Sequence, residues 1–144
     1  MRIATKLITG IISILVLTTG CKSNNSIKDI KQQGLMLQVR VLLSEPNDAN
    51  TISYAARLIP DKGLISDNAV KTKLAYQMDS TFYIQSGKGR IYANLVQPVA
   101  NGVAGTYEYL VSFDRPGGNS MKGKLIYQDK YINHQKYQIT LNNE

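Results

Sequence analysis

Few side chains in this sequence have the chemistry of a catalyst or a metal ligand. Cys21 is the only cysteine and His134 the only histidine among the 144 residues. Zinc sites usually take several cysteine or histidine ligands, so the sequence predicts no metal and no cofactor. A serine–histidine hydrolase would have to use His134, which no Gly-x-Ser-x-Gly elbow accompanies. We therefore expect an exposed His134 and a protein that is not an enzyme.

The ten acidic residues offer little for acid–base catalysis. Most of the aspartates fall in turn sequences, where a carboxylate bonds to its own backbone. These are Asp48, Asp61, Asp67, Asp79 and Asp114. Glu108 is the one acid inside a strong strand pattern, between Tyr107 and Tyr109, and we expect it to face solvent.

The stretch Gly87-Lys88-Gly89-Arg90 has the glycines and cations of a phosphate-binding loop, but its context differs. A P-loop has a longer glycine-bounded segment that ends in Lys-Ser/Thr at the start of a helix. Here the tetrad separates two strand-like runs and predicts a hairpin turn. The loop tips at 98–102 and 114–118 are further places where small β-domains bind partners. Our candidate partner contacts are Lys88, Arg90 and Arg115.

The first twenty residues have the parts of a secretory signal. Arg2 and Lys6 are basic, residues 7–17 (LITGIISILVL) are mostly apolar, and Thr19 and Gly20 are small. A helix of these 11 residues would extend roughly 16 Å, about half of a ~30 Å hydrocarbon core. The segment therefore indicates a signal peptide rather than a spanning helix.

Residues 17–21 (LTTGC) resemble the lipobox of bacterial lipoproteins, a Leu-Ala/Ser-Gly/Ala-Cys sequence. Gly20 and Cys21 match its two most restrictive positions, and Thr18 stands where Leu or Val is usual. The resemblance implies cleavage before Cys21 and addition of a diacylglyceryl thioether and an N-acyl group to that cysteine. Two or three acyl chains hold a protein durably on a bilayer. Lys22 in place of aspartate implies the outer membrane.

An ordinary signal peptide, with Cys21 as a bystander, is the alternative. It would leave one free thiol in an oxidising compartment, which is unusual for a secreted protein. We therefore expect a lipid-anchored protein of the bacterial cell envelope that faces the periplasm.

The length of the expected mature chain is that of a single domain. Removal of residues 1–20 leaves 124 residues, with 15 basic against 10 acidic side chains and a net charge of about +5. The charges are interspersed along the chain and include no Lys/Arg run of the kind that binds nucleic acid. No disulfide can form within the domain, so its core must hold it together.

From residue 34 onward the pattern is that of short β-strands. Residues 21–33 lack hydrophobic periodicity and predict a lipidated N-terminus followed by a flexible tether. Residues 34–144 alternate apolar and polar side chains in short runs separated by Pro, Gly and Asn signals. The predicted strands include 35–43, 52–59, 70–77, 81–85, 90–97, 106–113, 122–128 and 131–141. Seven or eight antiparallel strands predict a single small β-sandwich, with a partly open β-barrel as the alternative.

Function does not follow from any motif downstream of Cys21. The size, the lipid signal and the β-pattern resemble the sandwich lipoproteins of type VI secretion and some secretin pilotins, which implies a protein-binding accessory of an envelope machine. An inhibitor or immunity lipoprotein that neutralises a lysozyme or a toxin is the alternative. A lipid-binding barrel ranks lower, because bulky Leu, Val, Tyr and Phe would fill its interior.

Overall fold

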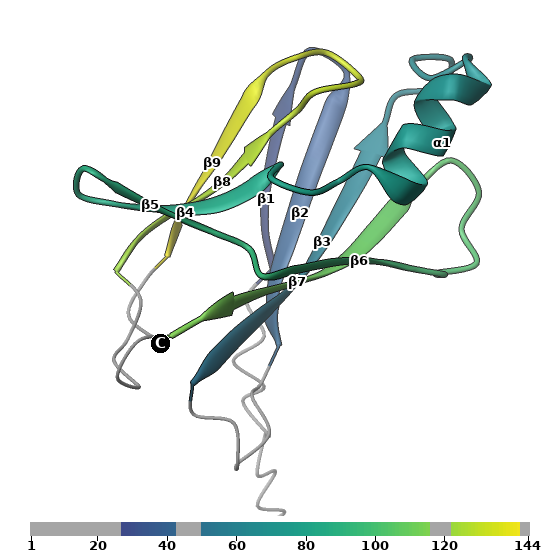
Figure 1. The fold of residues 1–144 in the computed structure, drawn as a ribbon. Coiled ribbons are helices and arrows are strands. Elements are labelled where there is room, and N and C mark those ends of the chain that lie inside the picture. Colours follow the sequence, from purple (N-terminus) through teal and green to yellow (C-terminus); the bar gives the residue numbers. More distant parts are fainter. Residues whose placement is uncertain (1–26, 43–49, 116–121, 142–144) are drawn as a thin grey trace, which may run out of the picture.

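The computed structural model describes residues 27–42, 50–115 and 122–141, and these form nine strands and one short helix (Figure 1). The elements are β1 (Ile27–Gln32), β2 (Leu35–Leu42), β3 (Thr51–Pro60), α1 (Asn68–Tyr76), β4 (Phe82–Ser86), β5 (Gly89–Tyr92), β6 (Leu95–Val99), β7 (Tyr107–Asp114), β8 (Gly123–Gln128) and β9 (Lys136–Leu141). The strand count within these residues slightly exceeds the predicted seven or eight.

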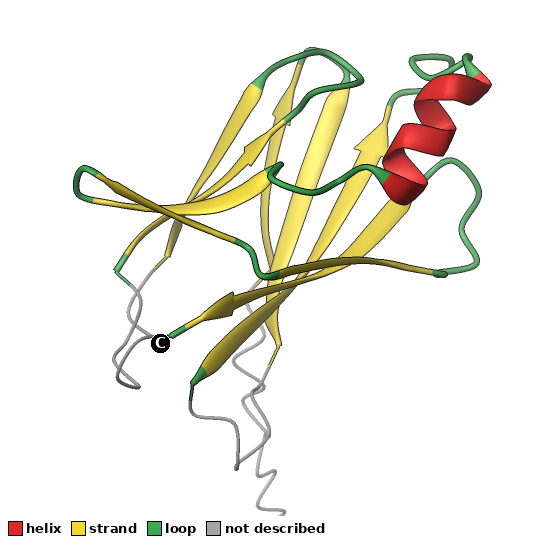
Figure 2. Ribbon diagram, in the orientation of Figure 1, coloured by secondary structure: helices red, strands yellow, loops and turns green. Residues whose placement is uncertain are grey.

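The strands form two antiparallel sheets. Sheet A has the order β1-β2-β3-β7-β6, and sheet B has the order β5-β4-β8-β9. The two sheets do not close into a barrel, so the predicted small all-β sandwich is confirmed. Figure 2 shows α1 beside the strands at one end of the molecule.

Alternation along the strands places the core between the sheets. In β3, every second side chain from Ile52 to Leu58 is buried, and the intervening ones are partly exposed. Full burial of one Leu or Phe side chain contributes about 1.5–3 kcal/mol relative to exposure. The largest fully buried side chains are Tyr54, Tyr109, Tyr127, Tyr137, Phe82, Phe113, Leu35, Leu37, Leu58, Leu74, Ile84 and Leu125.

Four aromatic rings join the two sheets. Phe82 stacks on Tyr127 with ring centroids 4.9 Å apart, and Tyr127 lies 5.7 Å from Tyr137 within sheet B. Phe82 also reaches Tyr109 of sheet A, at 6.3 Å. Aromatic pairs of this kind contribute about 0.5–1.5 kcal/mol each beyond the area they bury. We call these four side chains the aromatic cluster.

Two predicted segments have different structures. Residues 27–32 are strand β1 and not tether, because they pair along their whole length with β2, from Ile27 opposite Arg40 to Gln32 opposite Leu35. Residues 68–76 are a helix and not a strand. The side chain of Asp67 caps it by accepting from the Ala69 N–H at 2.7 Å.

Two other predicted strands are shorter than expected. The run from Arg90 to Gln97 divides between the sheets, because the Ala93 N–H bonds to Phe82 of sheet B and the Asn94 N–H to Ser112 of sheet A. The last strand begins at Lys136, because residues 129–135 form a loop. The β4–β5 hairpin and strands β2, β3, β7 and β8 agree with the sequence pattern.

The loop at 129–135 folds around one buried carboxylate. The Asp129 side chain accepts from the backbone N–H groups of Ile132, Asn133 and His134 at 2.6–2.9 Å. The Tyr127 hydroxyl also donates to it, at 2.8 Å. The side chain of His134 is exposed, as predicted. The backbone of His134 has a positive φ of 58°.

The strand register defines two ends of the domain. At the end where β1 begins lie Ile27, Leu42, Asp114 and Leu141. We call this the Ile27 end. The opposite end carries α1, the β1–β2 turn and the loops at 61–67, 100–106 and 129–135 (Figure 1). We call it the α1 end.

Substitution of Gly123 tests whether the backbones of β8 and β4 lie too close together at this point to admit a Cβ atom. Gly123 has a φ of 150°, and a Cβ at this position would overlap the backbone carbonyl oxygen of Gln85. We expect Gly123→Ala to lower the free energy of unfolding by more than about 2 kcal/mol. Gly102→Ala is the matched control, because Gly102 also has a positive φ, of 69°, but open space around it.

For Gly102→Ala we expect a loss of about 1 kcal/mol. Urea denaturation followed by circular dichroism measures both variants. Equal losses would contradict a close approach of the β8 and β4 backbones at this point.

Candidate functional site

A groove of about 580 Å³ lies at the α1 end. One wall is the end of β3 with the segment that follows it, the other is the β6–β7 loop with the first residue of β7, and α1 contributes one residue. The lining residues are Ile59, Pro60, Asp61, Lys62, Gly63, Ile65, Lys71, Ala104, Gly105, Thr106 and Tyr107. The two walls are 39 residues apart at their nearest in sequence, from Ile65 to Ala104, so the groove exists only in the folded chain.

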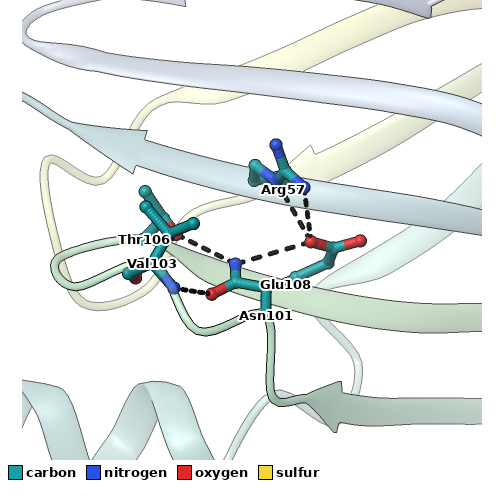
Figure 3. Close-up of polar contacts among 5 residues, drawn as sticks. All are labelled: Arg57, Asn101, Val103, Thr106 and Glu108. Atoms are coloured by element: carbon teal, nitrogen blue, oxygen red, sulfur yellow. Dashed lines mark hydrogen bonds and ion pairs between the residues drawn. The ribbon is translucent and has the colours of Figure 1, made fainter.

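An ion pair on the outer face of sheet A holds the β6–β7 loop (Figure 3). Arg57 donates to Glu108 Oε2 from Nη2 at 2.8 Å and from Nε at 3.1 Å. Asn101 Nδ2 donates to Thr106 Oγ1 at 2.9 Å and reaches the same Glu108 oxygen at 3.4 Å. Asn101 Oδ1 accepts from the Val103 N–H at 2.9 Å. These contacts close the loop into a defined wall.

The loop also covers the Glu108 carboxylate. The Glu108 side chain is only 15% exposed, against 41% for its partner Arg57. The expectation that Glu108 faces solvent is therefore wrong: it lies on the outer face, but its cross-strand neighbour Arg57 and the Asn101 amide shield it. A partly buried, twofold hydrogen-bonded pair is stronger than an exposed one.

The other wall is tied to the β1–β2 turn. The Asp61 N–H donates to the Gly34 carbonyl at 2.7 Å, and Lys31 pairs with the Asp61 carboxylate at 2.6 Å. Both side chains of that pair are about half exposed, so the backbone bond is the firmer link.

Tyrosine hydroxyls fix α1 beside the groove. Tyr109 donates to the Leu74 carbonyl at 2.7 Å, and Tyr131 donates to the Gln77 carbonyl at 2.6 Å. Burial raises the pKa of Tyr109 well above its usual value of 10, so the phenol stays protonated and can donate. Burial also raises the pKa of Tyr107, which lines the groove.

The groove offers binding groups of two kinds. Ile59, Ile65 and Tyr107 give it apolar surface, and the exposed ammonium groups of Lys62 and Lys71 stand at its rim. The Asp61 carboxylate, which also lines the groove, is ion-paired with Lys31. Such a surface suits an apolar side chain flanked by carboxylates or carbonyls. In the part of the chain that the structure describes, no three His, Cys, Asp or Glu side chains gather to hold a metal ion.

The predicted contact residues lie elsewhere. Lys88 is in the β4–β5 turn and Arg90 is in β5, both on sheet B, whereas Arg115 follows β7 of sheet A. Arg90 lies over the Tyr83 ring, 5.1 Å from its centroid, and a hydrogen bond with Tyr92 raises its pKa. The backbone N–H of Arg115 bonds to the Asn50 carbonyl. Cys21, the predicted lipidation site, is outside the described residues.

The sequence contained one signal for the groove. The loop tip at 98–102 is recognisable in the sequence, and Asn101 within it holds the β6–β7 loop, but the apposition of residues 59–65 with that loop is not visible there. Comparison of the chain with protein-family models, curated proteins and solved structures gave no match. The helix found in the described residues, α1, has nine residues, and that part of the chain contains no helix that could span a bilayer.

Glu108→Gln tests the hold on the β6–β7 loop. Loss of the charge weakens two hydrogen bonds to Arg57, so we expect unfolding to become easier by about 1–2 kcal/mol. The amides of residues 100–106 should exchange faster with deuterium, because the contacts of Glu108 with Arg57 and Asn101 that hold the loop are weakened. Hydrogen–deuterium exchange by mass spectrometry measures the local effect.

Asp61→Asn is the control, because it breaks the half-exposed pair with Lys31. Its expected cost is below about 1 kcal/mol, with no change at residues 100–106. Unaltered exchange in Glu108→Gln would mean that the ion pair does not hold the loop.

Proposed function

We propose that this chain is a lipoprotein of the bacterial envelope, acylated at Cys21, whose sandwich is a non-catalytic docking domain. Its partner is a protein of an envelope machine such as a secretion system, bound at the groove of the α1 end. The observation that carries the proposal is the position of this groove, at the opposite end of the domain from the first residue of β1.

The distance from the proposed anchor supports this arrangement. Cys21 precedes Ile27 by six residues. A fully extended chain of that length reaches about 20 Å at most. A lipid on Cys21 would therefore keep the Ile27 end near the bilayer, and the α1 end would be presented to proteins away from the membrane.

The chemistry of the groove favours binding over catalysis. Its walls supply apolar contact from Ile59, Ile65 and Tyr107 and two cations at the rim. Charged rims steer and orient partners, and apolar centres contribute most of the affinity. A protruding segment of a partner with an apolar side chain and acidic neighbours fits both features.

Cys21→Ser tests the anchor. Without the thiol no thioether can form, so the protein should move from the membrane pellet to the soluble fraction of cells lysed at high salt, where exposed charges are screened, with its circular dichroism spectrum unchanged. Metabolic labelling with a tagged fatty acid should mark the original protein and not the variant. Labelling of both, or of neither, would exclude acylation at Cys21.

The charge reversals Lys62→Glu and Lys71→Glu, made together, test the docking groove. We expect an epitope-tagged chain, cross-linked in cells and purified, to recover a specific envelope protein, and the double variant to recover about tenfold less. The double variant Lys130→Glu and Lys136→Glu is the matched control, because both lysines are exposed and lie outside the groove.

Equal losses in the two double variants would show that the groove is not the contact. Recovery of a soluble hydrolase or toxin in place of an envelope component would support the inhibitor or immunity function instead.

A further inference from the structure

The two sheets differ in charge. Residues 82–92 and 122–141, which contain all of sheet B, carry six lysines and arginines and a single acid, Asp129. Asp129 is 2% exposed, and backbone N–H groups occupy its carboxylate. The remaining described residues carry eight basic and six acidic side chains. Within the described chain, the accessible charge of sheet B is therefore entirely positive.

Two of these cations fall in one line with Lys28 of β1, at the edge of sheet A. Lys28, the second residue of β1, donates to the Thr140 carbonyl of β9 at 2.8 Å. Thr140 is opposite Lys124 of β8, Lys124 is opposite Gln85 of β4, and Gln85 is opposite Arg90 of β5. Residues directly opposite each other share a face, on strands about 4.8 Å apart. We call Lys28, Lys124 and Arg90 the cationic row.

Local contacts hold the far part of this row in place. Arg90 lies over Tyr83, whose ring is 5.4 Å from that of the half-exposed Tyr92. Gln85 Nε2 donates to the carbonyls of Gly87 and Gly89 at 2.9 and 3.0 Å, which fixes the turn that carries Lys88. A guanidinium held in this way loses little side-chain entropy when it binds.

Two members of the row, Lys28 and Lys124, lie at the end of the domain where β1 begins. Lys28 is one residue from Ile27, and Lys124 follows Gly123, which is opposite Leu141 at the same end. Lys122 directly precedes β8 there. In the described residues, neither ion pair of the domain involves a cation of this group.

We propose that the cationic row, with Lys88 and Lys122 beside it, binds anionic phosphate headgroups at the surface of the membrane. The inference rests on the proposed lipid anchor only for its orientation. Arginine and lysine donate strong, charge-assisted hydrogen bonds to phosphate oxygens. A partly exposed tyrosine such as Tyr92 suits the boundary between headgroups and water. The lipid would supply attachment and the row would orient the domain, with the α1 end away from the bilayer.

Vesicle co-sedimentation tests this surface. The probe is the mature chain, residues 21–144 with Cys21→Ser, mixed with vesicles of phosphatidylcholine alone or of phosphatidylcholine with phosphatidylglycerol. We expect binding to the anionic vesicles only, weakening as salt is added, because salt screens exposed charges. Arg90→Gln with Lys124→Gln should weaken this binding about tenfold, since each cation near an anionic surface contributes severalfold.

Two matched variants make the test specific. Lys73→Gln with Lys130→Gln removes the same charge at the α1 end and should leave vesicle binding unchanged. Arg90→Lys with Lys124→Arg keeps the charge and should retain most of the binding. Circular dichroism and thermal midpoints confirm that each variant is folded.

Three outcomes would overturn the proposal. They are equal binding to neutral and anionic vesicles, equal losses in the two glutamine double variants, and binding to soluble poly-glutamate without binding to vesicles. The last would assign the row to an acidic protein. Because Cys21 is serine throughout, absence of acylation in cells would refute the proposed function and leave this result standing.

Discussion

The aromatic cluster between the sheets is the contact on which the other parts of the domain depend. Phe82, Tyr127 and Tyr137 of sheet B pack together, and Phe82 meets Tyr109 of sheet A. Each of the three tyrosines also uses its hydroxyl at the edge of the core. Tyr109 holds α1 through Leu74, Tyr127 bonds to Asp129, and Tyr137 donates to the Gln32 carbonyl at 3.0 Å. One apolar cluster thus joins the sheets and positions the elements of the α1 end.

The groove is a consequence of this arrangement. Tyr109 fixes the helix against sheet A, and its sequence neighbour Glu108 points to the opposite face, where it pairs with Arg57. Adjacent residues of one strand therefore support the helix and the β6–β7 loop from two sides. The shielded ion pair holds one wall, the Asp61–Gly34 backbone bond holds the other, and the buried Tyr109 hydroxyl holds the helix, so the groove has a defined shape in this chain alone.

Charge is separated in space although it is mixed in sequence. Along the chain, basic and acidic residues are interspersed, without long runs of consecutive charges. In the fold, sheet A contains paired charges, such as Arg57 with Glu108, and sheet B presents cations alone within its described residues. The antiparallel order β5-β4-β8-β9 brings Arg90 and Lys124 onto one face from positions 34 residues apart. Proposed docking and proposed membrane contact then fall at opposite ends.

By itself, the sequence determined the class of the fold and most of its strands, because alternation and turn residues act over a few neighbours. It did not determine the helix at 68–76, since Val70 and Leu74 are compatible with both periods and the Asp67 cap selects one. It also missed β1, whose polar residues form a strand only against β2. Only the tertiary structure decided the groove and the cationic row. Both are made by residues far apart in the chain, and no local pattern encodes which strands become neighbours.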